Sequence, residues 1–184
     1  MKARGIETTV EDLVLEALER HGYTDQDSKC LVQCFELPIL EYVRSHTAVN
    51  LLYLTNRPEV AGNPEVLQNL QDQRILFICV NKGMLLHTDN SRHCDQEPNE
   101  ELIYKIKSFG LKLFAYTFKT ETNSLCWENA GDYRNELETF YNLGLDGYFS
   151  DFPNTVHSFL QEKFKREESY GFLNRLATIF KLRF

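Results

Sequence analysis

Five short apolar runs alternate with amphipathic segments along this chain of 184 residues, and this alternation constrains the fold most strongly. A strand that is followed by a helix, several times in succession, predicts a parallel sheet with helices packed on it and right-handed crossovers. The predicted strands are residues 30–35, 50–55, 74–80, 111–118 and the apolar part of 144–153. The predicted helices are residues 8–21, 38–46, a short one from residue 64, 100–109 and 132–142.

Several predicted helices carry recognisable start or stop residues. Thr8 and Glu11 have the spacing of a capping box, and Asn63 before Pro64 is a cap followed by a proline suited to a first turn. Gly22 and Gly110 stand where the first helix and the 100–109 helix should end. The alternation is therefore supported by capping as well as by hydrophobic pattern.

Composition indicates a soluble globular chain and argues against nucleic acid as a partner. Hydrophobic residues make up 42% and charged residues 26% of the sequence, as in ordinary soluble domains. The length suits a single domain with a sizeable core. A formal net charge of −7 would repel a phosphate backbone, and no run is long enough to span a membrane.

The cysteines predict a reducing compartment. Five cysteines are an odd number and lie partly in apolar runs, so free thiols are expected rather than a disulfide framework. The first residues lead into charged helical sequence and show no secretory signal. We therefore expect a cytoplasmic location, although a signal would escape notice if the chain were truncated at its amino end.

The segment 144–153 has the sequence pattern of a helix end, a turn, a buried strand and the start of a new helix, in that order. Asp151, at the end of this strand, has two interpretations. A short carboxylate there can cap the helix that starts near Pro153, and this interpretation is favoured from the stretch alone. Alternatively, Asp151 faces a ligand, because the carboxyl ends of parallel strands converge on one edge of the sheet.

Residues 110–121 and 144–153 resemble the last two barrel strands of the glycerophosphodiester phosphodiesterase family, in its bacterial periplasmic and plant variety. Residues 31–36, Leu-Val-Gln-Cys-Phe-Glu, resemble that family's Val-Gln-Ser-Phe-Glu strand, with Cys34 in place of the serine. The likeness runs from about residue 6 to residue 165 and corresponds to the carboxyl-terminal half of the family's fold.

This resemblance implies an α/β fold, specifically the second half of a (β/α)8 TIM barrel. It also implies hydrolysis of glycerophosphodiesters to glycerol 3-phosphate and an alcohol, with a divalent metal, calcium or magnesium. The family's His-Arg-Gly, Glu-x-Asp and Glu-x-Lys motifs are absent from this sequence. We therefore expect no catalytic residue and no metal ligand in this chain, and no activity of the chain alone.

What remains of the family's site is a substrate-binding wall. Because side chains alternate along a strand, Gln33 with Phe35, and Tyr116 with Phe118, should each share a face that points into the barrel. Phe149, Asp151 and Phe152 stand at the end of the last strand. These seven residues are the predicted substrate pocket. The alternative is that the aromatic rings simply fill the barrel interior.

One polar loop imitates a metal site. His87 and His93 flank a stretch that also contains Asp89, with Cys94 and Asp95 directly after it. This spacing matches no established metal motif, and a solvated loop is the favoured interpretation.

The sequence divides into a partial barrel, residues 1–167, and a tail, residues 168–184. The tail carries an amphipathic helix pattern with positive charge, which would either dock on the barrel or lie on a membrane surface. A half barrel leaves two strand edges unpaired, so a second copy of the chain or another partner could cover them. The alternative function is therefore a non-catalytic half barrel that binds or regulates a partner, or docks on a membrane.

Overall fold

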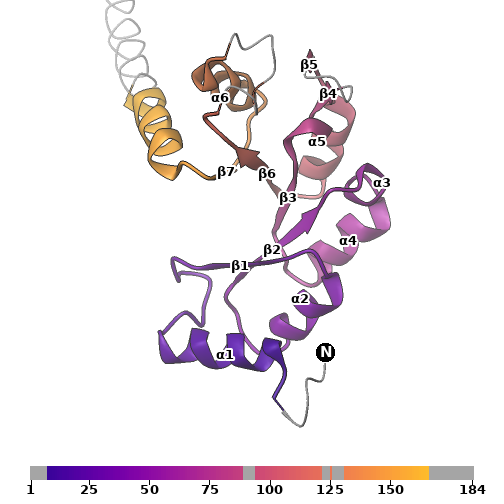
Figure 1. The fold of residues 1–184 in the computed structure, drawn as a ribbon. Helices are drawn as coiled ribbons and strands as arrows, with labels where there is room; N and C mark the ends of the chain where they lie inside the picture. Colours follow the sequence, from indigo (N-terminus) through magenta and orange to yellow (C-terminus); the bar gives the residue numbers. More distant parts are fainter. Residues whose placement is uncertain (1–7, 89–93, 122–124, 126–130, 166–184) are drawn as a thin grey trace, which may run out of the picture.

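The computed structural model describes residues 8–88, 94–121, 125 and 131–165. Within them, five strands form one parallel sheet in chain order, which curls as Figure 1 shows. The strands are β1 (Leu31–Cys34), β2 (Asn50–Thr55), β3 (Phe77–Asn81), β6 (Lys112–Phe118) and β7 (Gly147–Ser150). This is the predicted α/β architecture, a partial TIM barrel in which neighbouring strands are also neighbours in sequence.

Helices connect the strands, as the alternation predicts. They are α1 (Val10–Arg20), α2 (Leu37–Arg44), α3 (Pro58–Ala61), α4 (Pro64–Asp72), α5 (Glu100–Ser108) and α6 (Tyr133–Asn142). A further helix begins at residue 153 and continues to the end of the described part at residue 165. It is held to α6 by the ion pairs Arg134–Glu162 and Lys163–Glu138.

The two faces of the sheet have very different cores. On the helix side, side chains such as Leu51 and Tyr53 join a large cluster that runs from Leu18 to Phe159. On the opposite face, Leu52, Leu54 and Cys79 are the buried members of a small cluster. The alternation of Leu51 to Leu54 between these faces is the period of two expected for a strand. The inner, concave face therefore has few packing partners among the described residues.

The first helix begins one residue later than predicted. Thr9, not Thr8, is its N-cap, and Asp12 completes the capping box in place of Glu11. Asp12 also accepts a hydrogen bond from the Tyr42 hydroxyl at 2.6 Å, which ties α1 to α2. This hydrogen bond, together with those from Thr9, lowers the pKa of the Asp12 carboxyl. Asp12 thus combines a local capping contact with Thr9 and a tertiary contact with Tyr42, which Glu11 does not offer.

The third strand starts at Phe77 rather than at residue 74. Arg74 adopts a left-handed conformation, with φ of 56°, and the Ile75 amide donates to the Leu70 carbonyl at 2.8 Å. This is a helix C-terminal motif built on a residue other than glycine. The first part of the apolar run therefore closes α4 before the strand begins.

A second, two-stranded sheet occupies a region predicted to be a polar loop. β4 (Leu86–Thr88) pairs antiparallel with β5 (Cys94–Pro98) after the short 3-10 helix η1 (Lys82–Met84). Leu85 and Leu86 are buried, and they anchor the start of this two-stranded sheet in the core. Only the backbone of His87 and Cys94 belongs to the described structure, and His93 lies outside it, so the metal-like pattern of this loop stays a sequence observation.

The predicted tail, residues 168–184, lies outside the described residues. In the part of the chain that is described, none of the helices combines the length and the apolar character needed to cross a bilayer.

Candidate functional site

A cavity of about 220 Å³ opens on the concave face, at the carboxyl ends of β1, β2, β6 and β7. Eight residues from these strand ends line it: Gln33, Phe35, Leu54, Tyr116, Thr117, Phe149, Ser150 and Asp151. In barrels of parallel strands, this end of the sheet is where ligand-binding groups gather. The topology thus brings residues more than a hundred positions apart to one hollow.

Five of the seven predicted pocket residues lie around this cavity. They are Gln33, Phe35, Tyr116, Phe149 and Asp151. Their grouping follows from the parallel register, because β1 and β2 and, further along, β6 and β7 end at the same edge. The structure places these side chains together; whether they bind a substrate stays a prediction.

Phe118 lies on the other face, which contradicts the expectation that it shares a face with Tyr116. Ala115 pairs with Tyr148 and Phe118 pairs with Ser150, so β6 holds one extra residue between these two pairs. Such a bulge reverses the facing of the residues after it. Phe118 is only 2% exposed and packs in the outer core, with its ring 5.1 Å from that of Phe140.

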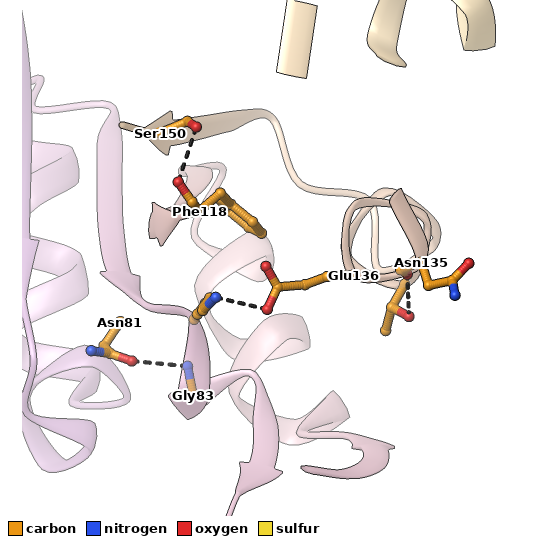
Figure 2. A network of polar contacts seen from close by, with 8 residues as sticks. Asn81, Gly83, Phe118, Asn135, Glu136 and Ser150 are labelled. Atoms are coloured by element: carbon orange, nitrogen blue, oxygen red, sulfur yellow. Dashed lines mark hydrogen bonds and ion pairs between the residues drawn. The ribbon is translucent and has the colours of Figure 1, made fainter. Parts of the chain in front are cut away.

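Phe152 is also outside the cavity. Its side chain is 37% exposed, and its amide donates to the Ser150 hydroxyl at 3.0 Å. The same hydroxyl donates to the Phe118 carbonyl at 3.0 Å (Figure 2). Ser150 therefore spans the gap between the two strand ends and orients the turn that follows β7. The sequence did not predict Ser150, Thr117 or Leu54 as cavity residues. Neither a bulge in a strand nor a polar residue at a strand end has a distinctive sequence pattern.

Two of the cavity walls are aromatic and meet at right angles. The rings of Phe35 and Tyr116 lie 6.0 Å apart with an interplanar angle of 89°. Phe35 is 50% exposed, unusual for a phenylalanine at a strand end. The Tyr116 hydroxyl is buried with no hydrogen-bond partner among the described residues. Burial, with a smaller effect of Cys79, raises the pKa of Tyr116.

The rim of the cavity carries an ion pair. Lys119 Nζ lies 3.1 Å from Asp151 Oδ2, with side chains 41% and 50% exposed. The Asp151 amide donates to the Phe118 carbonyl at 3.2 Å, which fixes the backbone there. Within the described chain we find no first-turn amide that donates to the Asp151 carboxylate. The capping interpretation is therefore wrong, and Asp151 faces the cavity and Lys119.

A second polar network lies on the helix side of the sheet (Figure 2). Glu136 of α6 accepts from Lys82 Nζ at 2.7 Å, and the lysine nitrogen lies 5.6 Å from the centroid of the Phe118 ring. Glu136 is only 2% exposed. Burial raises the pKa of its carboxyl, while Lys82 partly offsets that effect. This network joins the segment after β3 to α6.

The described residues do not fit a metal centre. Among them, no three histidine, cysteine, aspartate or glutamate side chains are grouped so that they could hold an ion. Asp151, the carboxylate in the cavity, is paired with a lysine rather than with another acid. We therefore assign no metal-dependent step to these residues.

The comparisons with known proteins agree with this architecture. The chain resembles a solved structure from Agrobacterium tumefaciens, described as a presumed glycerophosphoryl diester phosphodiesterase, with 18% identity and a TM-score of 0.51. That match covers 83% of this chain and 51% of the other, so the chain spans about half the length of that protein. The likeness establishes the fold. A search of the curated proteins returned no match.

A family model gives the assignment. The model described as the glycerophosphoryl diester phosphodiesterase family matches residues 2–155, which include all five strands of the main sheet. Members of this family generally depend on a metal ion. The chain, with its curled parallel sheet and its cavity at the strand ends, belongs to the glycerophosphoryl diester phosphodiesterase family.

Proposed function

We propose that this chain forms the substrate-binding wall of a glycerophosphodiester phosphodiesterase, which hydrolyses a glycerophosphodiester to glycerol 3-phosphate and an alcohol. The observation that carries the proposal is the cavity at the carboxyl ends of β1, β2, β6 and β7. It unites side chains from the three sequence segments that resemble this family, and family membership supplies the reaction class.

The chemistry of the lining suits such a substrate. The aromatic walls of Phe35, Tyr116 and Phe149 offer apolar faces to carbon atoms of the ligand. Gln33 and Ser150 add neutral hydrogen-bonding groups beside them. Lys119, at the rim, supplies a positive charge that would attract the phosphodiester anion of the ligand. The cavity can thus hold and orient a diester.

We propose further that the described residues bind the diester without cleaving it. The sequence has no His-Arg-Gly and no Glu-x-Asp motif, and the described residues contain no cluster of three or more side chains placed to hold a metal ion. In this family, a calcium or magnesium ion and a histidine pair would neutralise charge and transfer protons. Those groups would then come from polypeptide other than the described residues.

The test uses the full chain with calcium or magnesium present. We expect glycerophosphoglycerol to bind, as measured by titration calorimetry, with no release of glycerol 3-phosphate. Tyr116→Ala should weaken this binding, because the ring forms a cavity wall. Tyr104→Ala is the matched control, since Tyr104 is 76% exposed on α5 and lines no part of the cavity.

Two results would contradict the proposal in different ways. Absence of diester binding removes the proposed function altogether. Release of glycerol 3-phosphate that disappears in Tyr116→Ala and persists in Tyr104→Ala shows instead that the chain is itself catalytic.

A second candidate function rests on the sheet edges. The outer edges of β1 and β7 have no strand partner in the described part of the chain. Unpaired edges readily pair with another polypeptide, so a non-catalytic half barrel that docks on a partner or on a second copy is the alternative. Sedimentation equilibrium over a range of concentrations separates the two candidates: a stable oligomer that binds no diester favours the second.

A further inference from the structure

We propose that residues 172–184 of this chain, the docking segment, pack as an amphipathic helix on the concave face of the sheet and cover the cavity at the strand ends. The docking segment lies outside the described residues, whereas the face that it covers lies within them. The inference goes beyond the proposed function and does not depend on it, because docking can be measured without any diester.

The apolar character of the concave face is the first support. Its cluster consists of eight residues, all from strands: Leu52, Leu54, Cys79, Leu31, Phe77, Phe114, Tyr116 and Phe149. Among the described residues, no helix contributes a side chain to this cluster. At the mouth of the cavity, Phe35 is 50% exposed. A contiguous apolar surface of this kind is typical of a site that another element covers.

The sequence of the docking segment is the second support. Its apolar residues recur at the spacing of one helix face: Phe172, Leu173, Leu176, Ala177 and Phe180. A helix of this length is about 20 Å long, and a strand of seven residues such as β6 is about 23 Å long. The apolar stripe therefore matches the concave face in length as well as in character.

The direction of the last described helix is the third support. Val156, near its start, lines a small hollow together with Tyr133 at the start of α6. Lys163, near its end, has its Nζ 5.4 Å from the centroid of the Tyr141 ring, close to the end of α6. The two helices thus run in the same direction. Because α6 leads from the end of β6 to the start of β7, the described chain stops toward the amino ends of the strands.

From there the concave face is within reach. Residues 166–171, which include Gly171, allow about 24 Å between residue 165 and the docking segment. Packed layers lie about 10 Å apart, so the step from the outer layer past the edge of β7 to the inner layer is about 20 Å. That edge has no strand partner in the described part of the chain.

Charge is the fourth support. The docking segment contains three basic residues, Arg175, Lys181 and Arg183, and no acidic one. Since the whole chain has a net charge of −7, the 171 residues before the segment carry −10, and they attract it. A segment that runs from the amino to the carboxyl ends of the strands also brings its last two cations to the half-exposed carboxylate of Asp151.

The first helix offers a rival apolar surface at a greater distance. Val10 and Leu13 of α1 are 68% and 54% exposed. Figure 1 shows α1 beside β1 at one end of the curled sheet, and the last described helix beside α6 at the other end. The order of the sheet places four strand spacings, about 19 Å in all, between β7 and β1. The concave face is therefore the closer of the two surfaces.

Docking has a consequence for ligand binding. A docked segment lies over Phe35 and Tyr116, so a diester enters the cavity only when the segment is displaced. The apparent affinity for the diester is then reduced in proportion to the fraction of open molecules. Substitutions that weaken docking should therefore tighten diester binding to the full chain.

Photo-cross-linking from the docking segment identifies the surface that it covers. The full chain carries benzoylphenylalanine in place of Phe180 and is mixed with chain labelled with nitrogen-15. After illumination, mass spectrometry should find cross-links to residues 31–35, 112–118 or 147–151 within one chain. Cross-links to α1, cross-links that join labelled to unlabelled chains, or none at all would each overturn the inference.

Hydrogen exchange measures how firmly the segment is held. Its amides should exchange at least tenfold more slowly in the full chain than in the double variant Leu176→Ser, Phe180→Ser. Phe35→Ser should reduce this protection at least threefold. The matched controls are Tyr104→Ser, 76% exposed on α5, and Thr178→Ser, off the apolar stripe; both should leave it unchanged. Equal exchange in the full chain and the double variant contradicts docking, as does protection that appears only with phosphatidylserine vesicles.

Titration with glycerophosphoglycerol separates this inference from the proposed function. The double variant Leu176→Ser, Phe180→Ser should bind the diester at least threefold more tightly than the unaltered chain. If neither binds it while the cross-links persist, the proposed function is removed and the docking stands. If both bind it equally, the segment does not cover the cavity, which overturns the inference and leaves the proposed function standing.

Discussion

Lys82 Nζ lies 2.7 Å from Glu136 Oε1, although the two residues are 54 positions apart. Lys82 follows β3 directly, and Glu136 comes from the first turn of α6. The glutamate side chain is 3% exposed and the lysine side chain 18%. This pair therefore fastens the only helix between β6 and β7, within the described chain, to the middle of the sheet.

Breaking the Lys82–Glu136 pair should lower the free energy of unfolding, and the loss should depend on which of the two residues is substituted. Lys82→Met leaves a buried carboxylate without its cationic partner, and removing one partner of a buried pair costs about 3–5 kcal/mol. Glu136→Gln leaves the partly exposed lysine, which can turn toward water, so its cost should be smaller. Urea unfolding of the two variants gives this comparison. A larger loss in Glu136→Gln than in Lys82→Met would contradict the assignment of Glu136 as the more deeply buried partner.

The raised pKa of Glu136 makes stability depend on pH. Because burial raises the pKa of this carboxyl above its usual value of 4.5, the folded state binds the proton more tightly than the unfolded state. The stabilisation from this proton is complete below pH 4.5 and is lost as the pH rises through the folded-state pKa. The free energy of unfolding of the wild type, relative to Glu136→Gln, should thus fall from pH 4.5 upward. A rise over the same range would show that the lysine, not burial, dominates.

Local signals predicted the fold well, since apolar period, caps and helix-stop residues are short-range properties. Asn63 caps α4, as its position before Pro64 indicates, and Gly110 adopts the positive φ of a helix stop. The five strands follow from apolar runs of the right length, and their order follows from the parallel crossovers. The family motifs then located the edge of the sheet where the cavity lies.

What could not be predicted depends on register and on tertiary partners. The extra residue in β6 turns Phe118 to the outer core. The hydrophobic pattern of the sequence does not indicate this bulge, because a regular strand would simply continue the alternation of side chains. Asp151 pairs with Lys119 at the rim of the cavity, and no local pattern in the sequence indicates that pair. The Lys82–Glu136 pair was likewise invisible, because a lysine in a turn and a glutamate in a helix are both ordinary surface residues in sequence.

Substitution of Tyr148 tests how much a buried hydroxyl without a hydrogen-bond partner costs in stability. Its hydroxyl is buried and has no partner among the described residues, and burial strongly raises its pKa. A buried polar group without a partner costs about 1–3 kcal/mol. Tyr148→Phe should therefore leave stability unchanged or raise it by about 1 kcal/mol. Thermal unfolding measures this, and a clear loss of stability would reveal that the hydroxyl has a partner in solution.

Gly147, at the start of β7, stands where the concave face leaves no room for a side chain. A Cβ placed there would overlap the ring of Phe114, whose neighbours in the small inner cluster include Phe77 at 5.7 Å and Phe149 at 6.3 Å. The ring cannot withdraw without disturbing these contacts, so Gly147→Ala should destabilise the fold by about 1–3 kcal/mol. Denaturant unfolding gives the value.

Gly62→Ala is the matched control for this substitution, because a Cβ there meets Leu102 and the Pro58 carbonyl at an ordinary 3.5 Å. It should change stability by less than about 0.5 kcal/mol. If the ring of Phe114 is the cause, shortening it in the double variant Gly147→Ala, Phe114→Leu should cost less than the sum of the two single substitutions. Strict additivity would place the strain in the backbone of β7 instead, and would separate the packing of the inner face from the stability of its last strand.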